Sequence, residues 1–287
     1  MAPIATESPL ASHRKHPDFQ KTAGDDVGFG VAEDTTSFKD KHAERDYIKG
    51  RLAGAYRIFG HYGLNEGLAG HITARDPIDP ETFWVNPLGV DFNIINKSDL
   101  LRVDHKGNVL DHGPKSKLLN KAAFLIHGAI HAARPDVICA AHTHSVHGRA
   151  YCSLGKPLEM ISLESCLFFE DQVLFEGKGV VLAEDEGCDI ADALGEKKAA
   201  LLRNHGLLTV GQSIEEAVFW FYTLDKCCHV QLLADAAADG RGGATVKITD
   251  EEAEYTKGIV GTHKGGWFGG KALFDLIDEV TGKKYWQ

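Results

Sequence analysis

The sequence predicts a layered α/β domain built around a mixed β-sheet. Short apolar runs with strand character alternate irregularly with longer segments whose apolar residues recur every three or four positions. The chain has 287 residues, 43% of them hydrophobic, which is enough to bury a large core. No internal repeat is visible. We therefore expect one domain at residues 37–243, with a flexible arm at 1–36 and a helical tail at 244–287.

The first half of the domain is expected to contain a long helix followed by a meander of short strands. The helix is predicted at residues 37–61, because its apolar residues share one face and Gly60 and Gly63 mark its end. A glycine-rich turn then precedes several short apolar runs that are separated by turn residues. These runs predict strands at residues 71–75, 83–85, 100–103 and 108–110.

In the second half, buried strands are expected to alternate with helices. A helix at residues 120–133 should end near Pro135, since the residue before a proline disfavours helical backbone. Continuous apolar runs predict buried strands at residues 137–141, 179–182, 199–202 and 207–210. Further helices are predicted at residues 188–194, 213–238, 250–260 and 271–280.

The composition excludes several classes of protein. The chain has 41 Asp and Glu but only 31 Lys and Arg, so its net charge is −10 and no basic surface remains to bind nucleic acid. No apolar stretch reaches the roughly 20 residues of a membrane span. The N-terminus lacks the apolar core of a secretory signal. The six cysteines lie mostly in apolar runs, which favours free buried thiols and a cytoplasmic location.

Three of the 15 histidines form a candidate metal site. His142 and His144 are two residues apart at the end of an expected strand, so both rings can reach one ion at about 2.0–2.1 Å. On spacing alone, polar residues that cap the strand explain the pair equally well. His205 interrupts a buried run, where an imidazole costs free energy unless it is bonded or ligated. The three side chains together are typical of a catalytic metal site with one open position.

Several sequence blocks resemble the class II aldolase/adducin head-domain family, which includes fuculose-phosphate and ribulose-phosphate metalloenzymes. They occur in order within about residues 41–240, and they are GLNEGLAGHITAR at 63–75, RPD at 134–136, HTHS at 142–145 and LLRNHG at 201–206. The resemblance implies a three-layer α/β/α fold with a mixed central sheet, and a homo-oligomer, with a tetramer favoured.

The resemblance also implies a divalent metal bound by three histidines. In this sequence the matching positions are His142, His144 and His205. Zinc is the expected ion, with Fe(II) or manganese as alternatives.

The sequence departs from the sugar-phosphate aldolases at three elements of their phosphate pocket. Where the family has Ser-Ser-Glu before a helix histidine that matches His127, this chain has Lys121, Ala122 and Ala123, so the catalytic carboxylate is absent. The Gly-Asn-x-Ser turn reads GHIT at 70–73, and the Pro-Thr-Gly turn reads PLG at 87–89. A small, non-phosphorylated carbonyl or hydroxy acid is therefore the expected substrate.

Other residues must then supply the acid or base. Glu164 is one candidate because it is a carboxylate in an apolar segment, although a surface-facing side chain is the favoured explanation. His71 is the other candidate, with structural packing as the alternative. Lys121, Thr73 and Glu66 are the expected substrate contacts.

Three functions are compatible with these residues. The first is a metal-dependent lyase, in which the ion polarises a carbonyl group. The second is a non-haem Fe(II) oxygenase on the same scaffold. The third is a non-enzymatic assembly module resembling the adducin head domain, although a scaffold has no need for three retained histidines.

Overall fold

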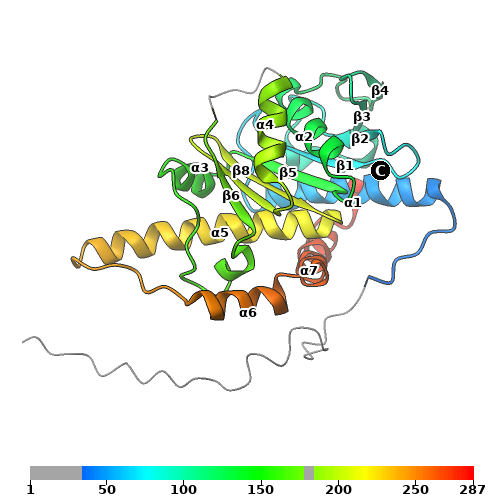
Figure 1. Ribbon diagram of the computed structural model, residues 1–287. Helices are drawn as coiled ribbons and strands as arrows, with labels where there is room; N and C mark the ends of the chain where they lie inside the picture. The colour runs from blue at the N-terminus through cyan, green and yellow to red at the C-terminus, as the bar shows by residue number, and fades with distance from the viewer. Residues whose placement is uncertain (1–33, 178–183) are drawn as a thin grey trace, which may run out of the picture.

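Within residues 34–177 and 184–287, which the computed structural model describes, eight strands form one mixed sheet. The strands are β1 (His71–Arg75), β2 (Thr82–Val85), β3 (Leu101–Asp104), β4 (Val109–Asp111), β5 (Cys139–Thr143), β6 (Gln172–Phe175), β7 (Ala199–Leu202) and β8 (Gly206–Gly211). Their order in the sheet is β4-β3-β2-β1-β5-β8-β7-β6. Neighbouring strands are antiparallel except for β6 and β7, which are parallel. Helices lie on both faces (Figure 1), so the predicted three-layer α/β/α fold is confirmed.

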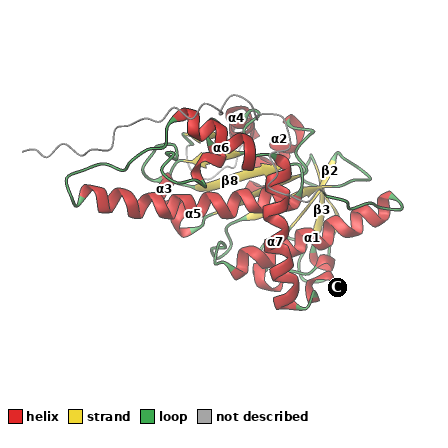
Figure 2. Ribbon diagram, turned by 90° about the horizontal axis from the view of Figure 1, so that it is seen from below, coloured by secondary structure: helices red, strands yellow, loops and turns green. Residues whose placement is uncertain are grey.

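The larger core lies between the sheet and a layer formed mainly by α1 (Lys41–His61), α5 (Ile214–Asp239) and α7 (His263–Thr281). Phe59 of α1 packs against Phe221 of α5, with ring centroids 4.8 Å apart. Figure 2 shows α7 crossing α5. The crossing is close because Gly270 has no side chain: a Cβ there would lie 2.2 Å from the Glu215 carbonyl oxygen. Two shorter helices, α3 (Val146–Cys152) and α6 (Asp250–Val260), complete this side.

The opposite face of the sheet is covered by α2 (Lys121–Ala133) and α4 (Glu184–Leu194). Ile126 and Ile130 of α2 share a buried core with Ile190 and Leu194 of α4. The two helices approach closely at Gly187, where a Cβ would lie 2.4 Å from the Leu125 carbonyl oxygen.

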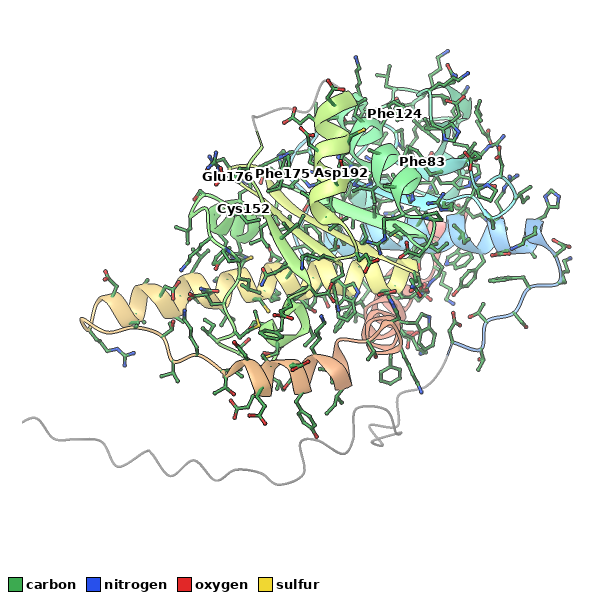
Figure 3. All side chains as sticks on the ribbon, viewed as in Figure 1. Phe83, Phe124, Cys152, Phe175, Glu176 and Asp192 are labelled. Carbon is green, nitrogen blue, oxygen red and sulfur yellow. The ribbon has the colours of Figure 1, made fainter. Side chains whose placement is uncertain are left out.

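A smaller cluster at the far end of the sheet includes Phe83 of β2 and the partly buried Phe124 of α2, which are labelled in Figure 3. The helix α2 therefore contacts both α4 and the outer strands of the meander.

The N-terminal ends of the helices show why their boundaries differ from prediction. α1 begins at Lys41 rather than residue 37, because the Asp40 side chain caps it by accepting a hydrogen bond from the Ala43 amide. α7 begins at His263, eight residues before its predicted start at 271, because Thr262 caps it and its glycines pack against α5. The expected helix at 213–238 is confirmed as α5, capped by Ser213.

Among the strands, β1 and β7 have the predicted boundaries, and the other expected strands that fall on described residues shift by one or two positions at their ends. The strand β6, the helix α3 and the short 3-10 helices were not predicted. The expected strand at residues 179–182 and most of the expected arm at 1–36 lie outside the described residues. None of the helices within the described ranges is long and apolar enough to cross a membrane.

Candidate metal centre

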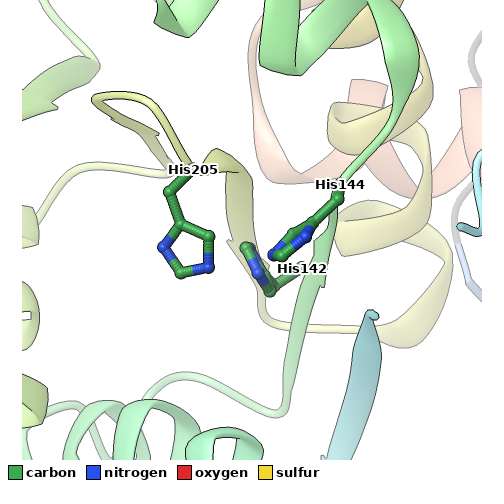
Figure 4. A group of neighbouring side chains, drawn as sticks. All are labelled: His142, His144 and His205. Atoms are coloured by element: carbon green, nitrogen blue, oxygen red, sulfur yellow. The ribbon is translucent and has the colours of Figure 1, made fainter. Parts of the chain in front are cut away.

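Three histidine rings converge where β5 and β8 meet (Figure 4). His142 lies in β5, His144 follows that strand, and His205 lies in the turn that joins β7 to β8. One ring nitrogen from each residue lies within 4.8 Å of the others. Because His142 is paired with Leu208 across the antiparallel β5–β8 pair, the turn that carries His205 lies at the same end of the sheet as His144. The three side chains are placed as a group that could hold one metal ion.

The position of His205 depends on an unusual turn. Asn204 has a φ of 56°, in the left-handed region, and the His205 amide donates to the Leu202 carbonyl group at 2.9 Å. A Cβ at Gly206 would lie 2.5 Å from the Thr143 carbonyl oxygen, so only glycine allows this approach of β8 to β5. The turn therefore brings the ring of His205 within 4.8 Å of the His142 ring, centroid to centroid.

The His142 ring is fixed by a backbone contact. Its Nδ1 lies 2.8 Å from the carbonyl oxygen of Leu207, and a carbonyl oxygen only accepts hydrogen bonds. Nδ1 must therefore carry the hydrogen, which leaves the lone pair on Nε2 available for a ligand bond. This is the arrangement that orients metal-binding histidines in proteins.

The environment keeps the cluster uncharged. Burial lowers the pKa of His142 well below its ordinary value, and burial also lowers the pKa of His205. The pKa of His144 is lowered to about 4, first by burial and then by the nearby His205 and Arg149. Neutral imidazoles are the form that binds metal, so the three side chains are ready to ligate an ion at neutral pH.

A second group of histidines lies behind the cluster, between β1 and α2. His71 stands opposite His142 in the β1–β5 pair, and its Nδ1 lies 3.1 Å from Nε2 of His127. The hydroxyl of Thr73 lies 2.9 Å from Nδ1 of His127 and 2.8 Å from Nε2 of His131. Burial lowers the pKa of all three histidines, to about 3 at His131, so the network is neutral.

This network locates two of the predicted site residues. His71 lines the cavity that opens beside the three metal-site histidines. Thr73 is fully buried and its hydroxyl is occupied by two imidazoles, so it lies behind the cavity wall. The structure therefore does not support the expected contact between Thr73 and substrate.

A cavity of about 740 Å³ opens beside the three metal-site histidines. At the start of α2, Ala122 lines the cavity whereas Ala123 is buried, so this helix offers no carboxylate there. Apolar side chains from α2, α4 and the sheet form part of the wall, including Phe175 at the end of β6 (Figure 3). The polar and charged residues that line the cavity are His71, Asn120, His142, His144, Arg149, Glu186, Arg203, Asn204 and His205.

The remaining predicted residues differ in their relation to this cavity. Glu66 lies at its rim, where its carboxylate is 3.2 Å from the guanidinium of the lining residue Arg149. Lys121 is exposed and lies between two lining residues. Glu164 is exposed at the start of a short 3-10 helix (Ser165–Phe168), because the four residues that follow it turn into the core. Glu164 is not brought to the cavity.

One lining carboxylate, that of Glu186, was not predicted from the sequence. Glu186 lies in the first turn of α4 and reaches the cavity because Gly187 allows α4 to lie against α2. Nothing in the local sequence indicates this position, since Glu186 belongs to an acidic helix start and its placement depends on packing between two helices.

Comparisons with known proteins agree with this geometry. Residues 50–232 match the family described as "Class II Aldolase and Adducin N-terminal domain". The chain is 45% identical over 231 residues to Decarboxylase NovR of Streptomyces niveus, covering 79% of this chain and 83% of that protein. It is 46% identical over 231 residues to the 4-hydroxy-3-prenylphenylpyruvate oxygenase/4-hydroxy-3-prenylbenzoate synthase of Streptomyces roseochromogenus subsp. oscitans, covering 79% and 81%.

A solved structure with a similar fold is that of an L-fuculose 1-phosphate aldolase from Glaciozyma antarctica PI12. It superposes with a TM-score of 0.81 at 42% identity, covering 87% of this chain and 96% of that one.

Proposed function

Since this chain belongs to the class II aldolase and adducin N-terminal domain family, we propose that it is a metal-dependent lyase acting on a small, non-phosphorylated carbonyl or hydroxy acid. The observation that carries this proposal is the group of three ring nitrogens within 4.8 Å of one another at a cavity wall. Three histidine ligands leave a coordination position open for substrate. His142, His144 and His205 are the proposed ligands and zinc is the proposed ion.

The chemistry of the donor set fits such an ion. The ring of His142 is oriented by the Leu207 carbonyl group, and burial keeps the three imidazoles neutral. When bound, the ion supplies a Lewis acid that polarises a substrate carbonyl group. Glu186 and His71, which both line the cavity, are the residues proposed to exchange a proton with the substrate.

One relative argues for a phosphorylated substrate, which therefore enters the test. The solved structure at 42% identity is titled an L-fuculose 1-phosphate aldolase. The start of α2 argues against a phosphorylated substrate in this protein, because alanines occupy the positions of the family's serine and carboxylate.

The second candidate function is a non-haem Fe(II) oxygenase. It is favoured by the relative at 46% identity whose name describes an oxygenase acting on a prenylated hydroxyphenylpyruvate. Imidazole ligands suit iron as well as zinc, so the identity of the ion decides between the two candidates.

A homotetramer is part of the proposal. It is supported by a set of exposed apolar side chains on α3, just after it, and on the second half of α5. These are Val146, Leu154, Val230 and Leu233, which are between 45% and 61% exposed. Light scattering at several protein concentrations would test the oligomeric state.

The metal is tested first. Protein purified without added metal should carry about one ion per chain, and His142→Ala and His205→Ala should lose it while remaining folded. His147→Ala is the matched control, because His147 stacks on His229 outside the cluster. Wild-type protein that binds no metal, with an unchanged melting temperature in His142→Ala, would contradict both enzymatic candidates and favour an assembly role.

The reaction is tested next with a panel of 2-oxo and 2-hydroxy acids and L-fuculose 1-phosphate. Turnover of an acid without oxygen by the zinc form supports the lyase. Bound iron with substrate-dependent oxygen uptake supports the oxygenase instead. Efficient cleavage of L-fuculose 1-phosphate would contradict the proposal of a non-phosphorylated substrate.

A further inference from the structure

We propose that Arg149 is the residue that binds the carboxylate of the substrate, and that Glu66 occupies Arg149 until the substrate arrives. This inference rests on the proposed function, because it specifies how the same cavity recognises an acid. Arg149 and Glu66 come from separate segments: the first lies in α3 and the second in the glycine-rich turn before β1.

Arg149 is a cation held next to the metal-site histidines. The helix α3 starts directly after His144 and Ser145, and Arg149 lies one turn into it and lines the cavity. Arg149 therefore shares the cavity wall with His142 and His144. A guanidinium binds a carboxylate through two parallel hydrogen bonds, which also fixes the orientation of the acid.

The contact between Arg149 and Glu66 is of a kind that a ligand can replace. The two groups are 3.2 Å apart, and their side chains are 44% and 49% exposed. Exposed ion pairs stabilise a fold only weakly, because both charges are well solvated when they are apart. A substrate carboxylate would replace one carboxylate by another at the same guanidinium.

The turn that carries Glu66 allows this replacement without a change in the backbone. The Ala69 amide donates to the carbonyl group of Glu66 at 2.9 Å, which holds the main chain of the turn. Gly63 and Gly67 adopt positive φ angles of 64° and 53° on either side of Glu66. Only the exposed side chain of Glu66 has to leave Arg149.

A second ion pair at the cavity provides a matched comparison. Arg203 also lines the cavity and lies 3.0 Å from Glu176, with side chains 39% and 66% exposed. Arg203 is held towards the outer edge of the described sheet, because Glu176 directly follows the terminal strand β6. Arg149 is held towards its middle, because Glu66 precedes β1, which lies next to the strand that carries His142. We therefore assign the carboxylate to Arg149 rather than to Arg203.

The experiment compares an acid with its neutral ester. Pyruvate and methyl pyruvate are titrated calorimetrically into the zinc-loaded full chain and into four variants: Arg149→Gln, Glu66→Gln, Arg203→Gln and Glu176→Gln. Arg149→Gln should weaken pyruvate binding at least about tenfold, the range expected for a lost charge-assisted contact, and leave methyl pyruvate unchanged. Glu66→Gln should bind pyruvate about two- to fivefold more tightly, since a weak competing pair is removed.

Several results would overturn the assignment. These are an unchanged affinity for pyruvate in Arg149→Gln, a larger loss in Arg203→Gln, or weaker pyruvate binding in Glu66→Gln. Inorganic phosphate is titrated in parallel. Tighter binding of phosphate than of pyruvate would also overturn the assignment. Zinc content is measured on the same samples. If the wild-type protein takes up no zinc, the proposed function is refuted but the assignment of Arg149 is not, because Arg149 needs no ion to distinguish an acid from its ester.

Discussion

At His131, burial and a nearby positive charge keep the imidazole neutral. Its Nε2 contacts the Thr73 hydroxyl, its ring stacks on Phe83, and its pKa is lowered to about 3, first by burial and then by the charge of Arg75. A group of this kind links the protonation state of a single residue to the stability of the fold.

We predict that the free energy of unfolding falls as the pH is lowered from 6.5 towards 3. The unfolded chain binds a proton at His131 near the ordinary pKa of 6.5, whereas the folded chain does so only near 3. Over this window the unfolded state holds more protons, so acid favours unfolding, and the contribution of His131 is fully present only above pH 6.5.

Urea denaturation of the metal-free protein between pH 7.5 and 4.5 would measure this dependence. In His131→Gln the slope of the unfolding free energy against pH should decrease by about one proton within the window. Equal slopes in the variant and the wild type would contradict the prediction.

Residue spacing predicted only the part of the site that lies within one strand or its neighbours. His142 and His144 were identifiable because alternate residues of a strand share a face, and His205 because it interrupts an apolar run. The network of His71, Thr73, His127 and His131 requires β1 to lie against α2, which no local pattern specifies. The exposed position of Glu164 likewise follows from tertiary packing.

At the scale of elements, the contact between α2 and α4 shapes the cavity. The two helices contribute Ala122, Ile126, Glu186 and Ile190 to its wall. Their separation is set at Gly187, where a Cβ would lie 2.4 Å from the carbonyl oxygen and 2.9 Å from the carbonyl carbon of Leu125. Backbone atoms cannot rotate away, so the glycine is required for this packing.

We predict that Gly187→Ala lowers the free energy of unfolding by about 1–3 kcal/mol, the usual cost of inserting a methyl group into a filled core. Gly258→Ala in α6 is the matched control, because no atom lies within 4 Å of its Cβ position. There, alanine should be neutral or stabilise by up to about 1 kcal/mol, as expected in a helix. Urea denaturation of both variants measures the difference, and equal effects would show that the close approach of the helices is not limiting.

The elements that were not predicted share weak local signals. β6 has only four residues, all partly exposed, and pairs within the described part of the sheet with β7 alone. α3 has seven residues and follows β5 almost directly, without a side-chain hydrogen bond at its N-cap Ser145. The start of α7 was missed because glycines disfavour a helix locally, although here they allow α7 to contact α5.

At the scale of the whole molecule, a buried ion pair and a ring contact of its arginine connect α1, α5 and α7, the three main helices of one layer. The Arg51 guanidinium of α1 lies 2.6 Å from the Glu215 carboxylate of α5, and the two side chains are 9% and 6% exposed. The same guanidinium lies 3.7 Å from the ring centroid of Phe274 in α7. The layered α/β architecture was predicted from alternating strands and helices, and its three layers from the resemblance to the family, but this connection between distant segments depends on the assembled fold.

We predict that Arg51→Met lowers the free energy of unfolding by about 3–5 kcal/mol, because it leaves the Glu215 carboxylate buried without a partner. Adding Glu215→Leu should restore most of this loss, since an apolar pair of similar volume avoids the cost of burying a charge. Lys271→Met is the control for loss of a surface ion pair on α7, where Lys271 and Asp275 are 45% and 60% exposed, and it should cost no more than about 0.5 kcal/mol. Urea denaturation of the four proteins completes the comparison. If the double variant is less stable than Arg51→Met, then the loss in Arg51→Met does not come from the unpaired Glu215 carboxylate.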